Sequence, residues 1–204
     1  MKGSSCTTGL RIRVLTVFAL TFISAAVLVF GLTSAAGTAL GVPTLPLELR
    51  ISVAVVSLIV LALVDVVGIR KRRYCLLGWR RQTPKTLGRR YSVTKVAAVW
   101  GFDAGLIVTT FRVGAITWGA LALTGLGFTS WWTGLAYGVA FTIPLLILIL
   151  KQPSGDSSTA QTSVGPRLEQ LLTKRPIVQL ASAIALLAGA VFLLRFFSTT
   201  RAFL

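Results

Sequence analysis

Two residues of opposite charge, Asp103 and Arg112, lie in an apolar stretch of the chain, WGFDAGLIVTTFR, residues 100–112. If a membrane helix enters from Lys95, Asp103 lies about 12 Å along it, at a rise of 1.5 Å per residue. An ionised Asp at such a depth costs roughly 2.5 to 3.5 kcal/mol to insert, so it usually faces a partner inside a helix bundle. The sequence therefore predicts that Asp103 is the residue most important to function.

The spacing of the two charges excludes a direct ion pair in one regular helix. Arg112 follows Asp103 by nine residues, and nine steps of about 100° place the two side chains on opposite faces. In one alternative, Arg112 lies at the outer interface and meets water or Glu48. In the other, Asp103, Thr109, Thr110 and Arg112 line a polar route through a discontinuous helix, whose freed backbone groups bind a solute or ion.

Other chemistries lack their usual side chains. The sequence contains no His, which excludes His-ligated haem, His-containing metal sites and the commonest general base. The two cysteines, Cys6 and Cys75, lie outside the apolar runs and are expected on the cytoplasmic side, where thiols stay reduced. We therefore predict no catalytic residue, no metal site and no cofactor, and an enzyme is the least favoured class.

The elements that carry these residues are predicted to be membrane helices. Of the 204 residues, 54% are hydrophobic and 13% charged, and the apolar residues form runs of about 20, enough to cross a hydrocarbon core about 30 Å thick. We predict one all-α domain, 1–204, a polytopic transmembrane helical bundle. Its five spans are 14–33, 49–69, 96–118, 131–150 and 177–195, with a basic cytoplasmic loop at 70–95 and a second cytoplasmic loop at 151–176. A broken or re-entrant segment at 93–127 would give six spans.

The first apolar run, residues 14–32, also resembles a signal peptide because basic residues precede it and small residues follow it. Signal-peptide cores are usually about 7 to 15 residues long. This run has 19 residues, so an uncleaved first span is favoured.

The net charge of +16 comes largely from one loop. Ten of the 21 Lys and Arg residues lie between Arg70 and Lys95, with no acid among them. This pattern is typical of a cytoplasmic loop under the positive-inside rule rather than of a nucleic-acid binder. It predicts the cytoplasmic membrane as the location, a cytoplasmic N-terminus, and an interfacial position for Asp65, paired with the basic residues that follow it. A surface for anionic lipid or a partner is the alternative to a pure orientation signal, formed by Arg70, Lys71, Arg72, Arg73, Arg80, Arg81, Arg89 and Arg90.

Small residues one turn apart predict close helix packing. Gly101 and Gly105 lie in one predicted span, and Gly134 and Gly138 in the next. Such pairs let helix backbones approach closely, so we predict that these two spans pack against each other. Pro144 should kink the second of them.

The stretch from Gly101 to Leu150, above all GLAYGVAFTIPLLILIL from Gly134, resembles the second half of the CcdA and DsbD-type membrane thiol carriers of the LysE-like superfamily. That family moves reducing equivalents through two intramembrane cysteines beside prolines. This chain has Asp103, Ala104 and Gly105 where the second cysteine is expected, and Pro43-Thr44-Leu45-Pro46 resembles the first motif without its cysteine. The resemblance therefore implies a helix-packing scheme and transport of another kind, because thiol exchange needs both cysteines.

Two functions remain open from the sequence. The first is a membrane protein that moves or binds a small solute or ion, with Asp103 as its central residue. The second is a non-catalytic subunit or assembly factor that packs beside a membrane protein partner or a second copy of itself. In both, the lipid bilayer is the main partner and nucleic acid is not one.

Overall fold

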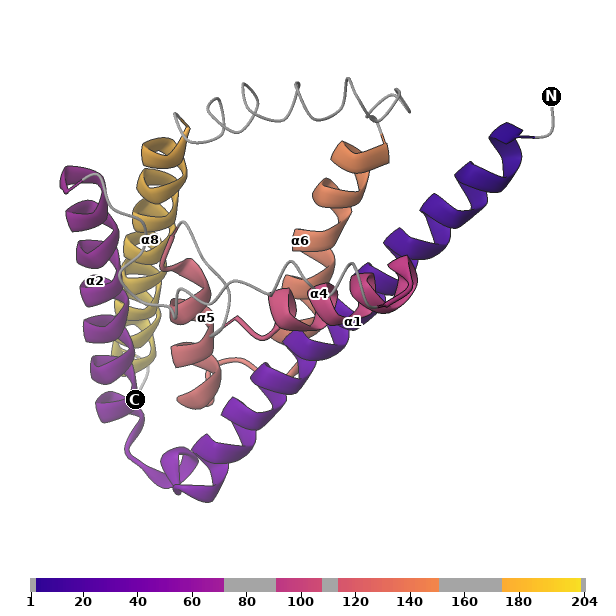
Figure 1. Ribbon diagram of the computed structural model, residues 1–204. Coiled ribbons are helices and arrows are strands. Elements are labelled where there is room, and N and C mark those ends of the chain that lie inside the picture. Colours follow the sequence, from indigo (N-terminus) through magenta and orange to yellow (C-terminus); the bar gives the residue numbers. More distant parts are fainter. Residues whose placement is uncertain (1–2, 72–90, 108–113, 151–173, 203–204) are drawn as a thin grey trace.

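The computed structural model describes residues 3–71, 91–107, 114–150 and 174–202. Every regular element in these ranges is helical, which confirms the predicted all-α class. In chain order the elements are α1 (Gly3–Ala39), the 3-10 turn η1 (Val42–Thr44), α2 (Leu47–Arg70), α4 (Val93–Gly105), α5 (Ile116–Gly125), α6 (Trp132–Leu150) and α8 (Arg175–Ala202) (Figure 1).

Three helices in the described part of the chain are long and apolar enough to cross a membrane. They are Gly9–Ala39 in α1, Leu47–Arg70 in α2 and Arg175–Thr199 in α8. They correspond to the first, second and fifth predicted spans. Their large aliphatic side chains are exposed on much of their surface, as expected for helices that face lipid.

A tight turn reverses the chain between α1 and α2. Gly41 takes the left-handed conformation, with φ 69°, which glycine adopts without a steric penalty. Pro43 lies inside η1 and Pro46 is the N-cap of α2, so both prolines lie where a helical backbone N–H is not needed. The turn reverses the direction of the chain, and α1 and α2 diverge from it (Figure 1).

The predicted span 96–118 is not one helix. The α4 helix ends at Gly105 and α5 begins at Ile116. Ile107, two residues after the end of α4, is fully buried with a positive φ of 59°, a conformation that ends a right-handed helix and is rare for β-branched residues. The segment 93–127 is therefore broken after α4, which is one of the possibilities that the sequence left open.

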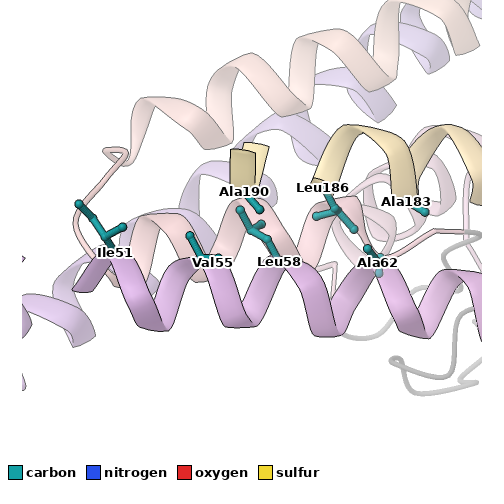
Figure 2. Close-up of a cluster of buried hydrophobic side chains, with 8 residues drawn as sticks. Ile51, Val55, Leu58, Ala62, Ala183, Leu186 and Ala190 are labelled. Carbon is teal, nitrogen blue, oxygen red and sulfur yellow. The ribbon is translucent and has the colours of Figure 1, made fainter. Parts of the chain in front are cut away.

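The helices form two groups. In the first, α2 packs along α8; in the second, α1 packs against α4 and α6. The short helix α5 contacts α1, α2 and α8, so it joins the groups. Figure 2 shows the core between α2 and α8, where side chains of the two helices face each other. Its labelled members are Ile51, Val55, Leu58, Ala62, Ala183, Leu186 and Ala190.

In the second group, glycines set the distance between helices. A Cβ added at Gly101 of α4 would overlap the carbonyl oxygen of Phe18 on α1, and one added at Gly105 would overlap that of Phe22. A Cβ at Gly134 of α6 would lie 2.8 Å from the carbonyl oxygen of Ala26 on α1. The predicted contact between the two glycine-bearing spans was therefore wrong, because both pack on α1.

Of the two other predicted packing residues in α6, Gly138 lies against α1, and Pro144 is exposed. A Cβ added at Gly138 would lie 3.0 Å from the Cα of Ile23 on α1. Pro144 lies inside α6, which continues to Leu150. The kink expected at Pro144 stays a prediction.

Candidate functional site

A fully buried carboxylate lies where α5 begins. Asp65 of α2 is 0% exposed. It continues a stripe of buried residues along α2, spaced three or four apart as one face of a helix requires. The members of this stripe are Ile51, Ala54, Val55, Leu58, Ala62, Asp65 and Gly68. Helical phase thus directs the only acid on this face toward the neighbouring helices.

The Asp65 carboxylate accepts hydrogen bonds from the start of α5. The backbone N–H of Ala115, the N-cap residue, lies 2.9 Å from Oδ1 and 3.0 Å from Oδ2. The next N–H, of Ile116, donates to Ser182 Oγ of α8 at 3.0 Å. The Ser182 hydroxyl also hydrogen-bonds the Asp65 carboxylate. Because the first N–H groups of a helix have no intrahelical partner, α2 and α8 together supply the cap that α5 lacks.

A glycine permits this close approach. A Cβ added at Gly114 would lie 2.8 Å from both Cβ and Oγ of Ser182 and 3.6 Å from Asp65 Oδ2. Any side chain at this position would overlap Ser182 and push the start of α5 away from α8. The segment from Gly114 to Ile116 therefore fits between α2 and α8 only because its first residue is glycine.

The same helix α2 also caps the other end of α5. The Nε of Arg50 donates to the carbonyl oxygen of Leu126, the C-cap residue of α5, at 2.9 Å. The Arg50 guanidinium also lies 5.1 Å from the centre of the Phe128 ring. A helix carries partial positive charge at its N-terminus and partial negative charge at its C-terminus. Asp65 and Arg50 thus oppose the dipole of α5 at both ends.

Further buried polar side chains lie on the helices that meet here. Gln179 of α8 is 0% exposed and lies three residues before Ser182, on the same face of α8. Thr117, in the first turn of α5, is also buried. Polar side chains at such positions are expensive in a membrane unless they have partners or face a polar route.

The residue favoured by the sequence, Asp103, lies on the other side of the break. It is half-buried in the last turn of α4, and its carbonyl oxygen accepts the N–H of Leu106. Asp103 therefore lies at the end of α4, before the break. Asp65, on α2, contacts the start of α5, after the break. The other three proposed pathway residues, Thr109, Thr110 and Arg112, lie outside the described residues.

The prediction that the Asp65 side chain extends out of the helix bundle to the interface was wrong. Full burial and the hydrogen bonds from α5 place its carboxylate inside the bundle. The signal in the sequence was helical phase, because Asp65 shares its face with the small residues Ala62 and Gly68. Small residues mark a helix face that approaches another helix, whereas distance from the basic loop alone suggested an exposed side chain.

Of the predicted lipid-binding cations, only Arg70 and Lys71 are described, and both are exposed at the end of α2. Arg72, Arg73, Arg80, Arg81, Arg89 and Arg90 lie outside the described residues. Within the described ranges, no group of three or more His, Cys, Asp or Glu side chains is placed to hold a metal ion.

Comparison with family models, curated proteins and solved structures gives no match to this chain. Its three long apolar helices are compatible with a membrane protein.

Proposed function

We propose that this protein is a multi-pass protein of the cytoplasmic membrane that moves or binds a small solute or ion at the break between α4 and α5. The observation that carries the proposal is Asp65, a fully buried carboxylate that meets the first N–H group of α5. Buried acids in membrane helices commonly mark ion or proton pathways. Half-helix ends are also common substrate sites in transporters.

The proposed mechanism exchanges one partner of the Asp65 carboxylate for another. In the described state, the Asp65 carboxylate accepts hydrogen bonds from the N–H of Ala115. A proton or small cation at the carboxylate would replace these hydrogen bonds and release the start of α5. Asp103, at the end of α4, and Thr109, Thr110 and Arg112, which follow it in sequence, are the other proposed pathway residues.

The orientation follows from the positive-inside rule. The helices α2 and α8 run antiparallel (Figure 1). Arg70 and Lys71 at the end of α2 therefore lie at the same end of this pair as Lys174 and Arg175 at the start of α8. We assign this end, and with it the N-terminus, to the cytoplasm. Five spans, with α4 and α5 together forming the third, place the C-terminus outside.

A structural role is the second candidate, and one observation favours it. The hydrogen bonds of Asp65 come from within the chain, so the carboxylate equally suits a fixed cross-link in a non-catalytic subunit or assembly factor. Such a subunit would pack beside a membrane protein partner or a second copy of this chain. A purified protein that stays monomeric in mild detergent, with no co-purifying partner, would count against this role.

Ion flux tests the transport role. The purified protein is reconstituted into liposomes, and fluorescent indicators follow H⁺, Na⁺ and K⁺ down imposed gradients. We expect flux above that of protein-free liposomes, lowered at least tenfold by Asp65→Asn and lowered also by Asp103→Asn. Glu48→Gln, an exposed acid at the opposite end of α2, is the matched control and should keep the wild-type rate. Equal flux in wild-type protein and in a correctly folded Asp65→Asn variant would contradict the proposal.

A further inference from the structure

The end of the molecule where α2 finishes and α8 begins carries four cationic residues. Arg70 and Lys71 close α2, and Lys174 and Arg175 lead into α8. The two helix ends lie side by side (Figure 1). We call these four residues the α2–α8 basic end.

The contacts deeper in the pair place the four cations at one level. Asp65 and Ser182 are hydrogen-bonded across the antiparallel helices. Arg70 lies about 7.5 Å beyond Asp65 along α2, and Arg175 lies about 10 Å beyond Ser182 in the same direction, at 1.5 Å per residue. The cations therefore form one cluster across two helices.

Within the described residues, the acids lie away from the exposed cations of this cluster. Arg70, Lys71 and Lys174 are exposed and Arg175 is half-buried. The acids in the described part of the chain are Glu48, at the far end of α2, Asp65, which is fully buried, and Asp103, on α4. The exposed side chains of Arg70, Lys71 and Lys174 thus present positive charge at the surface.

Exposed aliphatic side chains adjoin the cations on the membrane side. Val66 and Val67 precede Arg70 on α2 and are 45% and 37% exposed. Ile177 and Val178 follow Arg175 on α8 and are 66% and 50% exposed. A partner that fits both features has an anionic head and an apolar body. Phospholipid meets this description, whereas a nucleic acid or a soluble phosphate compound would contact the cations alone.

We propose that the α2–α8 basic end binds the headgroup of an anionic phospholipid, whose acyl chains lie along Val66, Val67, Ile177 and Val178. The length of α2 supports this position, since 24 helical residues span about 36 Å and so reach beyond a hydrocarbon core of about 30 Å into the headgroup layer. Cations there attract anionic lipid, each by roughly fivefold in affinity. The inference stands independently of solute transport.

Lipid titration of the full-length protein in mild detergent tests this inference. Binding of short-chain phosphatidylglycerol and of phosphatidylcholine is followed by native mass spectrometry. We expect phosphatidylglycerol to bind at least tenfold more tightly. Lys71→Gln combined with Lys174→Gln should lower that preference at least fivefold, because both changed side chains are exposed and their loss leaves the core intact. Arg195→Gln, near the other end of α8, is the matched control and should keep the wild-type preference.

Three results would overturn the proposal. The first is equal affinity for the two lipids. The second is a wild-type preference in the double variant. The third is displacement of bound phosphatidylglycerol by millimolar inorganic phosphate, which would identify a soluble phosphate site instead. Should the double variant fail to fold, the salt dependence of the wild-type protein decides, because headgroup binding through cations must weaken as salt rises, and salt-independent binding would contradict it.

Discussion

The two helix groups are held together in different ways. In α2 and α8, aliphatic side chains such as Leu58 and Leu186 meet between the helices (Figure 2). Around α1, the contacts with α4 and α6 bring backbone against backbone, and Gly101 and Gly105 lie against carbonyl oxygens. In a membrane, where lipid is as apolar as leucine, close backbone packing is a main source of helix association. The comparison predicts that added volume disrupts the α1 group more than the α2–α8 pair.

The helix α5 uses both kinds of contact. A Cβ at Gly119 would meet side-chain atoms of Leu186 and Leu58, from α8 and α2. A Cβ at Gly37 of α1 would overlap the backbone of Gly125. Toward α2 and α8, α5 also has side-chain caps, from Asp65, Ser182 and Arg50. We therefore expect α5 to be fixed more firmly to the α2–α8 pair than to α1.

The largest effect is expected from Gly101→Leu. Its side chain would overlap the Phe18 carbonyl of α1, and a backbone atom cannot move aside as a side chain can. Overpacking of this kind typically costs about 1 to 3 kcal/mol and sometimes more, so the variant should lose most of its folded, detergent-soluble yield. Gly31→Leu is the matched control on α1, because nothing lies within 4 Å of an added Cβ there. Equal yields of the two variants would contradict glycine packing between α1 and α4.

A smaller but still large effect is expected from Asp65→Ala. It removes the acceptor for the Ala115 N–H in a buried site, and an unsatisfied buried group costs about 1 to 3 kcal/mol. Asp65→Asn should recover part of this stability, because its amide oxygen can still accept one N–H. Thermal unfolding in detergent should give the highest midpoint for the wild type, a lower one for Asp65→Asn and the lowest for Asp65→Ala. An alanine variant as stable as wild type would show that α5 does not depend on this cap.

These two predictions mark what the sequence reveals about the fold. Hydropathy and charge were enough to predict the long helices, because membrane insertion depends on total apolar length. The partner of each helix was not predictable in this way. A glycine pair creates a flat surface but does not specify which helix occupies it, and both pairs lie against α1.

The candidate site was harder to predict for a related reason. Depth along the helix favoured Asp103, and closeness to the basic loop favoured an exposed Asp65. The burial of Asp65 depends instead on the face it shares with Ala62 and Leu58 and on a break in another helix. The break itself was one of two alternatives for residues 93–127, since the apolar run was too long for one span.

The smallest effect is expected from Ser182→Ala. Its hydroxyl accepts the Ile116 N–H and hydrogen-bonds Asp65, and a single hydrogen bond typically contributes about 1 kcal/mol. Ser52→Ala is the matched control, because the Ser52 hydroxyl is exposed and donates only to the Glu48 carbonyl of its own helix. Thermal unfolding should show a lower midpoint for Ser182→Ala and little change for Ser52→Ala. If Ser182→Ala and Ser52→Ala had equal unfolding midpoints, Asp65 alone would supply the stabilising cap at the N-terminus of α5.

The most direct test of the cap is amide hydrogen exchange at Ala115, followed by NMR on protein labelled with ¹⁵N-alanine. In the wild type, the Ala115 N–H is held by a fully buried carboxylate, so it should exchange slowly. In a folded Asp65→Asn variant it should exchange at least tenfold faster, while alanines in the α2–α8 core, such as Ala183, keep their rates. Fast exchange of Ala115 in the wild type, or an unchanged rate in the variant, would contradict the account.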